Sequence, residues 1–246
     1  MNQRLSNYKA VILAGGKGTR LYPITKEIPK PLLPVKRKPI LNYLVDLFFD
    51  FGIKDIAILI NKEFRGDFNW WKKRYFPNKK IKIAEEKKPL GTFGGLWLLR
   101  NWLKDSEFFL TNGDEIKEIN LEKMVDFHQK LGAIATVALT KVSNPKDYGI
   151  AICQNGLILK FLEKPKRPPS KYVSAGLYLF SPEIFDYHPG PVKGRGPHGT
   201  LRPKFSMVEK DILPRLAKEK KLAGFKFKGK WLDCGTWQRY EKALKV

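Results

Sequence analysis

Residues 8–20, YKAVILAGGKGTR, decide the fold of this chain. The stretch 8–14 is short and almost continuously apolar, which is typical of a strand buried on both faces of a parallel sheet. It ends at Gly15-Gly16, and Gly18 follows two residues later. Glycines let backbone N–H groups approach a phosphate closely, and successive amides form an anion-binding concavity. The sequence therefore predicts a parallel-sheet protein whose first strand leads into a phosphate-binding loop.

The first half of the chain alternates strands with helices. The predicted strands are 8–14, 55–60, 80–84, 107–111 and 133–142, and the predicted helices are 39–51, 63–76, 92–104 and 120–131. Repeated β-α units imply a doubly wound α/β sheet, mostly parallel and with helices on both faces. Ligands of such sheets bind beyond the carboxyl ends of the strands.

The second half has a mixed α+β pattern. The predicted strands are 149–153, 157–162, 173–180 and 222–228, and the predicted helices are 205–219 and 236–245. No linker is long enough to separate two independent domains, so we expect one domain over 1–246 with halves at 1–142 and 143–246. The Gly-, Pro- and Lys/Arg-rich segment 187–204 is expected to be a surface loop, the alternative being a lid that contacts phosphates.

Composition excludes several classes of protein. The chain has 246 residues, of which 43% are hydrophobic, too many for a disordered chain. No apolar run reaches eighteen residues, and the N-terminus does not resemble a signal peptide. Two cysteines cannot form a disulfide framework, so we expect a cytoplasmic protein.

The chain is strongly basic, with 47 Lys and Arg against 24 Asp and Glu, a net charge of +23. Such a charge attracts anions in general. The basic residues are spread along the chain rather than concentrated in an arm. This distribution favours a generally basic solvated surface over a dedicated nucleic-acid surface, which stays an alternative.

Two cations accompany the glycine loop. Arg20 supplies a planar fork suited to phosphate oxygens, and Lys30 lies between two prolines that restrict its backbone. The loop does not follow the Walker A pattern, because Lys17 precedes a glycine instead of Ser or Thr.

At these residues the chain resembles the sugar-1-phosphate nucleotidyltransferases, also called nucleotide-sugar pyrophosphorylases. The resemblance rests on G-G-x-G-T-R-L-x-P-x-T and P-K-P-L-x-P-V within residues 13–35. Shorter motifs follow in the family's order: PLGT at 89–92, NGD at 112–114, YG at 148–149, FLEKP at 161–165, SAG at 174–176 and WLDCGT at 231–236. The resemblance implies a Rossmann-like nucleotide-diphospho-sugar transferase fold. Some members add a C-terminal β-helix, for which this chain is too short.

The reaction implied by the resemblance joins a nucleoside triphosphate (NTP) to a sugar 1-phosphate, releasing pyrophosphate. The implied catalytic residues are Arg20, for the pyrophosphate, and Lys30, for the α-phosphate. The implied nucleotide-binding residues are Leu13, Ala14, Gly15, Gly16, Gly18, Thr19, Glu86, Gly91 and Thr92. The first half of the chain is accordingly expected to bind nucleotide and the second half sugar.

By resemblance, Asp114 and Asp233 bind Mg²⁺, an ion that takes oxygen ligands and few protein side chains. Sequence alone leaves each aspartate open as a turn-capping residue. The three histidines lie outside the motifs, and His128 is expected to be either a helix-surface or a packing residue.

The resemblance places the sugar phosphate on Lys164 and the sugar hydroxyls on Glu163, with Tyr148 and Gly149 lining the sugar pocket. The family often has Asn where this chain has Ser174. A hydroxyl is shorter than an amide, so a water molecule is one way to complete that contact.

The choice of base rests on Glu86. An ionised carboxylate only accepts hydrogen bonds, and guanine offers two adjacent donors whereas uracil and thymine offer one. This favours GTP, and the motifs look most like mannose- and heptose-1-phosphate guanylyltransferases. Base reading by backbone amides, with Glu86 solvated, is the alternative.

Other functions stay open. Within the enzymes these are a glucose-1-phosphate thymidylyl- or uridylyltransferase and a phosphocholine cytidylyltransferase. Outside them are a non-catalytic sensor of nucleotide sugars and a protein that binds RNA or a membrane surface. A homodimer is plausible for the family, but no interface can be located from sequence.

Overall fold

The computed structural model describes residues 4–188 and 204–245, which belong to two compact units. Unit 1 consists of Met1–Lys87, Phe109–Lys123 and Phe227–Val246. Unit 2 consists of Lys88–Phe108 and Met124–Lys226. Both units are assembled from segments far apart in the chain, whereas the two halves expected from sequence are each continuous. Most of the predicted loop 187–204 lies outside the described residues.

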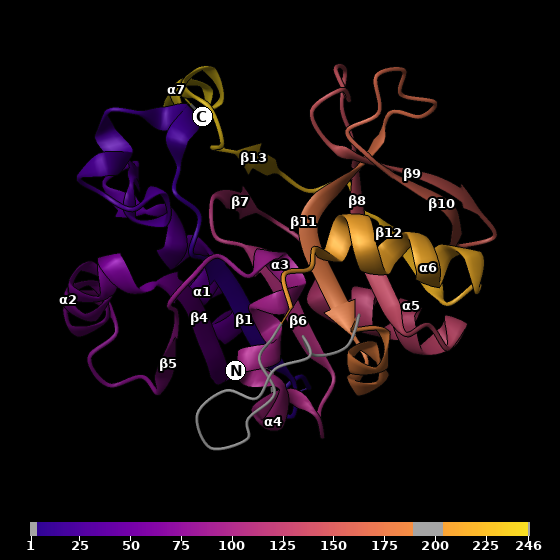
Figure 1. Ribbon diagram of the computed structural model, residues 1–246, viewed down its shortest axis with the longest axis horizontal. Coiled ribbons are helices and arrows are strands. Elements are labelled where there is room, and N and C mark those ends of the chain that lie inside the picture. Colours follow the sequence, from indigo (N-terminus) through magenta and orange to yellow (C-terminus); the bar gives the residue numbers. More distant parts are fainter. Residues whose placement is uncertain (1–3, 189–203, 246) are drawn as a thin grey trace. The chain divides into compact units, whose positions relative to one another are not determined.

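Unit 1 contains four of the five strands predicted for the first half of the chain, and the fifth, predicted at 133–142, belongs to unit 2. In the order of the sheet the four are β5 (Ile81–Glu86), β4 (Asp55–Asn61), β1 (Lys9–Ala14) and β6 (Phe108–Asn112). β1 and β4 run parallel in register from Lys9 beside Asp55 to Ala14 beside Ile60 (Figure 1). β1 is almost wholly buried, which explains its continuous apolar sequence.

Two small sheets complete unit 1, and neither was predicted. β2 (Pro34–Val35) pairs with β3 (Lys38–Pro39). β7 (Glu115–Lys117) pairs antiparallel with β13 (Trp231–Asp233). At two to three residues these strands are too short to show a hydrophobic period.

Unit 2 contains a mixed sheet. β8 (Ala135–Lys141) is parallel to β12 (Leu222–Lys226) and antiparallel to β11 (Tyr172–Phe180). β9 (Gly149–Gln154) and β10 (Leu157–Glu163) form a hairpin. Its two-residue turn, Asn155-Gly156, has positive φ at both positions, as the preferred hairpin turns require.

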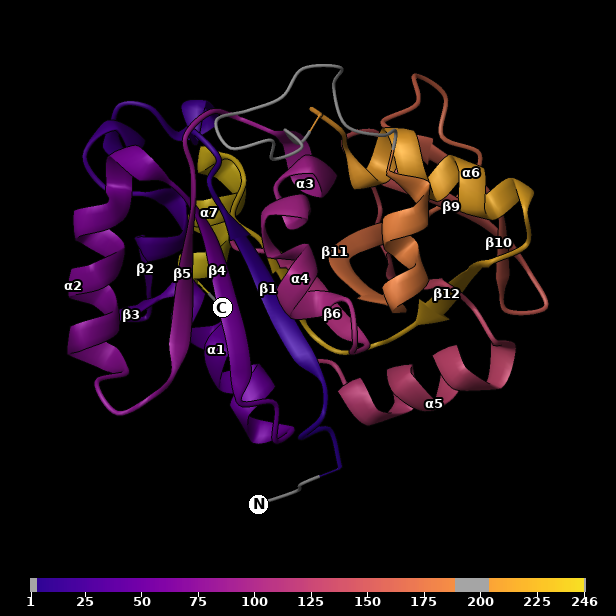
Figure 2. The same cartoon turned by 60° about the horizontal axis from the view of Figure 1, so that its bottom comes forward.

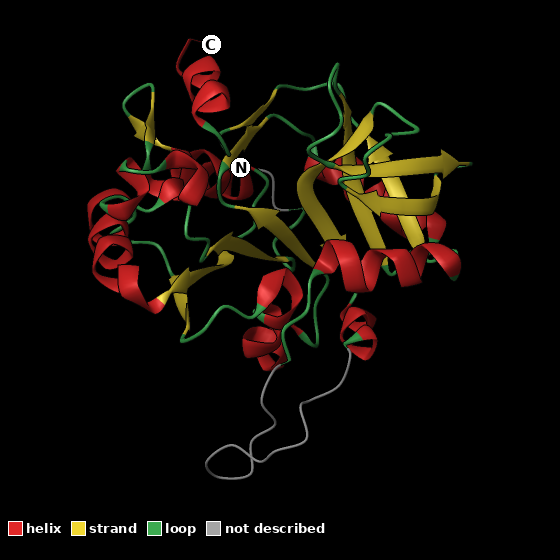
Figure 3. Cartoon of the chain, turned by 45° about the horizontal axis from the view of Figure 1, so that its top comes forward, coloured by secondary structure: helices red, strands yellow, loops and turns green. Residues whose placement is uncertain are grey.

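Helices cover both faces of the unit 2 sheet. α5 (Leu121–Leu131) packs Phe127 against Phe225 of β12. α6 (Leu213–Lys218) lies on β10 from the other side (Figures 2 and 3). The predicted mixed α/β fold with helices on both faces is thereby confirmed.

Most predicted helices agree with the structure within two residues. α1 (Ile40–Asp50), α2 (Arg65–Tyr75) and α7 (Trp237–Lys245) are the helices of unit 1. The short helical turns are η1 (Thr19–Leu21), η2 (Ile24–Lys26), η3 (Lys30–Leu32), η4 (Lys62–Phe64) and η6 (Pro182–Tyr187). None of the described helices is long and apolar enough to cross a membrane.

Two helix predictions were wrong. The predicted helix 92–104 is three pieces, α3 (Gly91–Gly94), η5 (Leu96–Leu99) and α4 (Arg100–Leu103), in a segment weakened by three glycines. The predicted helix 205–219 begins at η8 (Val208–Ile212), a π-helical turn that leads into α6. Its preceding residues are extended and bond to the 90–94 segment, since Ser206 accepts from Phe93 and Gly94.

Candidate active site

The glycine loop follows β1 directly. Gly18 has a left-handed φ of 65° and begins η1. Its carbonyl accepts from the Thr25 hydroxyl at 2.8 Å, and a Cβ on Gly18 would lie 2.9 Å from Thr25. Gly16 has no atom within 4 Å of the position a Cβ would take. The loop is therefore fixed at Gly18 and open at Gly16, which leaves room for a ligand.

Glu86 and Gly113 meet the carboxyl end of β1. A Cβ on Gly15 would lie 2.6 Å from a Glu86 carboxylate oxygen, so this carboxylate reaches the loop. The Gly113 amide donates to the Leu13 carbonyl at 2.9 Å. The same glycine is required there, because its Cβ would come within 2.6 Å of that carbonyl. Parallel strand ends thus bring Leu13, Ala14, Glu86 and Gly113 together, as expected for a ligand site of this fold.

Asp114 and Asp233 are 119 residues apart in sequence and adjacent in unit 1. The antiparallel pairing of β7 with β13 places Asp233 opposite Glu115. One residue further, the Cys234 amide donates to the Asp114 carbonyl at 3.0 Å. The two predicted metal ligands are therefore neighbours next to the end of β6.

Three cations gather at these carboxylates. Lys30 forms an ion pair with Asp114, and Arg239 of α7 donates to Asp233 at 2.7 Å. The Arg20 guanidinium lies beside Gly235, where a Cβ would be 3.3 Å from its nitrogen and 2.7 Å from Asp233 Oδ1. Arg20, Lys30 and both aspartates thus lie in one cluster, and Arg239 joins them although it lies outside the matched motifs.

A buried ion pair lies next to the cluster. Lys117 contacts Glu115 at 3.2 Å, with side-chain exposures of 0% and 8%. Trp231 donates to Glu115 at 2.7 Å, and Asn112 donates to it at 2.9 Å. Burial raises the pKa of Glu115 to about 7, with Asp114 and Asp233 adding to the rise and Lys117 opposing it. The sequence does not reveal this pair, because only the pairing of β7 with β13 buries it.

The neighbouring groups fix the charge of the cluster. Burial raises the pKa of Asp114, but attraction and hydrogen bonding from Lys30 outweigh it and leave that pKa below its usual value. Burial and the three nearby carboxylates raise the pKa of Cys234 to about 12. Cys234 is therefore a neutral thiol and not a nucleophile.

The donor set fits a divalent ion with few protein ligands. Asp114 and Asp233 offer carboxylate oxygens, which Mg²⁺ prefers. In the described part of the chain, no group of three or more His, Cys, Asp or Glu is arranged to hold a metal. Asp114 and Asp233 are therefore the two side chains of this cluster that were expected to hold a divalent ion and that lie side by side.

Unit 2 assembles the residues predicted for the sugar. Glu163 lies opposite Gly149 in the β9–β10 hairpin, and a Cβ on Gly149 would be 3.1 Å from its carboxylate. The Lys164 amide donates to the Tyr148 carbonyl at 3.2 Å. Lys164 Nζ lies 3.4 Å from Glu163 Oε1. Burial, then the charge of Glu209, raises the pKa of Glu163.

The remaining predicted residues, Ser174, Gly91 and Thr92, also belong to unit 2. Gly91 has a φ of 79°, and a Cβ there would lie 2.4 Å from the Ser206 carbonyl. The Thr92 hydroxyl donates to Glu209 at 2.8 Å, so it is already engaged within the protein. Nucleotide binding by Gly91 and Thr92 stays a prediction.

Among the described residues, His128 and His188 have no part in either cluster of motif residues. His128 is buried and contacts Thr136 at 2.7 Å and Ser181 at 3.0 Å, so of the two expected roles it has that of a packing residue. His188 stacks near Trp97, with ring centroids 4.2 Å apart, and His198 lies outside the described residues.

A family model described as nucleotidyl transferase matches residues 9–245, almost the whole chain. The chain belongs to the nucleotidyl transferase family. Mannose-1-phosphate guanylyltransferase 1 of Arabidopsis thaliana is 34% identical over 97% of this chain, and the chain spans 64% of that relative's length.

Solved structures show the same fold. A Bacillus anthracis structure named as a glucose-1-phosphate thymidylyltransferase, in complex with sucrose, has a TM-score of 0.83 and 30% identity, covering 97% of this nucleotidyl transferase and 94% of that chain. HddC from Yersinia pseudotuberculosis, complexed with GMP-PN, has a TM-score of 0.76 and 26% identity, covering 97% and 98%.

Proposed function

We propose that this nucleotidyl transferase joins a nucleoside triphosphate, GTP in first place, to a sugar 1-phosphate, giving an NDP-sugar and pyrophosphate. The observation that carries the proposal is the cluster of Asp114, Asp233, Arg20 and Lys30 in unit 1, where β1 ends in its glycine loop. Such a cluster can neutralise and position phosphates, which is the main requirement of phosphoryl-type transfer.

In this reaction a sugar-phosphate oxygen attacks the α-phosphorus in line, and the bond from the α-phosphorus to the bridging oxygen of pyrophosphate breaks. Arg20 stabilises the charge that develops on the departing pyrophosphate. Lys30 neutralises the α-phosphate, for which it must exchange its contact with Asp114. No protein nucleophile takes part.

Asp114 and Asp233 would hold Mg²⁺. When bound, the ion would supply positive charge that stabilises the negative charge of the phosphates. Arg239 orients Asp233 through its bond at 2.7 Å, and Gly235 fixes the other Asp233 oxygen at 2.6 Å. These contacts hold the carboxylate in one orientation before any ion arrives.

Guanine is the base that Glu86 suits best. Its carboxylate lies against Gly15, at the strand end where the base is expected. A carboxylate can accept from both N1–H and the amino group of guanine, whereas the carbonyls of thymine and uracil would repel it. The names of the guanylyltransferase relative and of the complex with GMP-PN agree with this choice.

Unit 2 would bind the sugar 1-phosphate. Lys164 supplies a cation for its phosphate, and Glu163 accepts from sugar hydroxyls beside Tyr148 and Gly149. Lys164 has a left-handed φ of 46°, so the Glu163-Lys164 pair is held in an uncommon backbone conformation.

The direct test is a matrix of GTP, dTTP, UTP and CTP against mannose, glucose, heptose and N-acetylated sugar 1-phosphates, with Mg²⁺ and pyrophosphate release as the readout. We expect turnover with GTP and one sugar. Preference for dTTP or UTP would contradict the Glu86 argument alone. No turnover with any pair would contradict the enzymatic function.

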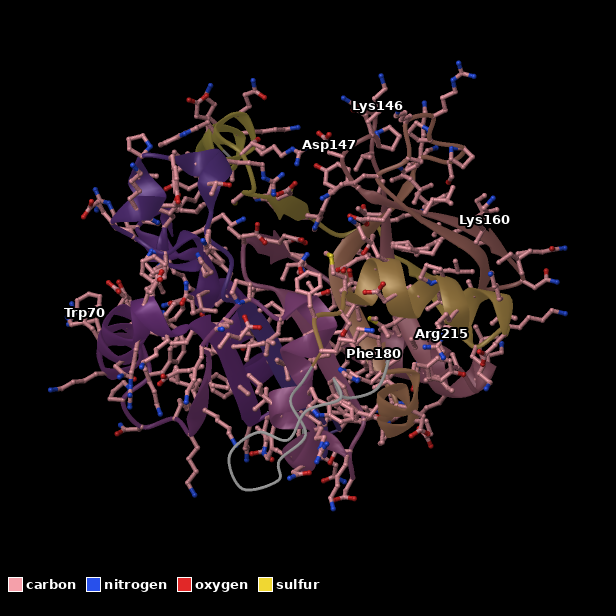
Figure 4. All side chains as sticks on the ribbon, viewed as in Figure 1. Trp70, Lys146, Asp147, Lys160, Phe180 and Arg215 are labelled. Atoms are coloured by element: carbon pink, nitrogen blue, oxygen red, sulfur yellow. The ribbon has the colours of Figure 1, made fainter. Side chains whose placement is uncertain are left out.

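Variants at the cluster test the proposed roles. Arg20→Ala and Asp114→Asn should each lower turnover about 10²-fold or more, a typical loss for a transition-state charge stabiliser. Lys160→Ala is the control, because it removes an exposed cation from β10 (Figure 4). Turnover near wild type in both cluster variants would refute the assignment.

A further inference from the structure

Glu209 is a buried carboxylate of unit 2 that lies in no matched motif. It is 9% exposed and sits in the π-helical turn η8, a type of turn often found at functional sites. One carboxylate oxygen accepts from the Thr92 hydroxyl at 2.8 Å, and the other accepts from the Tyr178 hydroxyl at 3.1 Å.

The carboxylate determines the direction of a whole chain of hydrogen bonds. An ionised carboxylate accepts only, so Thr92 and Tyr178 must both use their hydrogens on Glu209. The Tyr178 oxygen is then left to accept, and it accepts from the Ser174 hydroxyl at 3.3 Å. The Ser174 hydrogen is therefore engaged as well, while its oxygen accepts from the Gly176 amide at 3.3 Å.

The chain leads to the residues proposed for the sugar. Ser174 follows Val173, which pairs with Ile150 of β9, and Ile150 is next to Gly149. Gly149 lies opposite Glu163. Glu209 and Glu163 are also close enough to interact, because the charge of Glu209 contributes to the raised pKa of Glu163.

We infer that Glu209 is a positioning residue that makes Ser174 a hydrogen-bond acceptor for a hydroxyl of the sugar 1-phosphate, and this inference rests on the proposed function. A free serine hydroxyl both donates and accepts. Because the Ser174 hydrogen is held on Tyr178, only an oxygen lone pair remains for a ligand. Ser174 and Glu163 then both accept hydrogen bonds from sugar hydroxyls. A sugar that carries fluorine or hydrogen in place of the hydroxyl that Ser174 contacts therefore binds poorly.

The test uses Glu209→Gln, which keeps the shape but adds an amide that can donate to Tyr178 and reverse the chain. We expect the KM for the sugar 1-phosphate preferred in the matrix to rise about 10-fold, the loss of one hydrogen bond, with kcat and the KM for GTP changed less than twofold. Tyr178→Phe, which disconnects Ser174 from Glu209, should raise the same KM.

Glu219→Gln is the matched control. Glu219 also accepts from a tyrosine hydroxyl of unit 2, that of Tyr187, but this pair lies outside the Ser174 chain. The control variant should leave the KM for the sugar 1-phosphate within twofold of wild type.

A double-mutant cycle separates positioning from loss of structure. In a Ser174→Ala background, Glu209→Gln should have no further effect on the KM for the sugar, because the acceptor that Glu209 organises is gone. Effects that multiply independently, or an unchanged KM in Glu209→Gln, would overturn the inference.

If the wild-type protein shows no turnover, the result contradicts the proposed function and leaves the inference about Glu209 to be tested by binding. Calorimetric titration with each sugar 1-phosphate of the matrix, on the wild type and the same variants, then tests the inference on affinity instead of KM. Wild-type binding that weakens about 10-fold in Glu209→Gln supports the inference without turnover. No binding by the wild type overturns it.

Discussion

At the residue scale, substitution of two glycines beside β1 should affect two different properties, nucleotide binding at Gly15 and stability at Gly113. Gly15→Ala would place a Cβ 2.6 Å from the flexible end of Glu86, and that side chain can move away. We expect little change in stability and a rise of about 10-fold in the KM for GTP, as for a lost or weakened hydrogen bond. Steady-state kinetics and thermal melting measure both effects.

Gly113→Ala is the companion variant with the opposite outcome. The alanine Cβ would lie 2.6 Å from the Leu13 backbone carbonyl oxygen, and a backbone atom cannot change rotamer to relieve the clash. We expect a loss of about 1–3 kcal/mol in the free energy of unfolding. Equal melting temperatures for the two variants would contradict the predicted difference between a side-chain neighbour at Gly15 and a backbone neighbour at Gly113.

Glu163 gives a prediction about pH. Burial, then Glu209, raises its pKa above the ordinary 4.5, so the unfolded chain ionises first as the pH rises. Ionisation of Glu163 therefore lowers the free energy of unfolding. The loss is complete at a pH above the pKa of Glu163 in the folded protein and absent at a pH below 4.5. Glu163→Gln should melt higher than wild type at pH 7 to 8, with the difference shrinking toward pH 4.

Glu219→Gln should show the opposite sign in the same measurement. Hydrogen bonds from Tyr187 and Lys221 lower the pKa of Glu219, so its ionised form stabilises the fold at neutral pH. A Glu163→Gln variant that melts lower than wild type at pH 7 to 8 would show that Glu163 is well solvated or better paired.

At the element scale, one buried hydrogen bond joins α2 to α1. Trp71 donates to the Asn42 carbonyl oxygen at 2.7 Å, and both residues are buried. Trp71→Phe leaves that amide oxygen without its donor, so we expect a loss of about 1–3 kcal/mol in the free energy of unfolding. Chemical denaturation measures it.

The neighbouring Trp70 is a natural control. It is 63% exposed and points away from α2 (Figure 4), so Trp70→Phe should change the free energy of unfolding by less than about 0.5 kcal/mol. Similar losses in both variants would mean that ring size, and not the hydrogen bond, sets the cost.

The length of a strand decides whether the sequence pattern can predict it. β1 and β4 were predictable because burial on both faces requires a continuous apolar run. β7 and β13 were not, since three residues carry no period and their pairing joins segments more than one hundred residues apart. The broken helix at 91–103 was missed because apolar spacing outweighed its glycines in the prediction.

At the scale of the whole molecule, the charge of +23 should act on the rate of encounter with nucleotides. Raising the salt from 0.05 to 0.5 M shortens the screening length to a few ångströms. We expect the KM for GTP to rise several-fold while kcat stays nearly constant. A KM independent of salt would mean that only contact residues attract the nucleotide.

The sequence by itself determined most strands of the large sheet and the glycine loop, and its motifs pointed to Asp114 and Asp233, because these depend on local hydrophobic runs and on short motifs. Only the tertiary structure decided that Asp233 lies opposite Glu115 and that Arg239 donates to Asp233. It also decided that Glu209 accepts from Tyr178. Such contacts depend on strand register and on packing between distant segments. Neither leaves a local pattern, since each partner, taken alone, is an ordinary polar or charged residue.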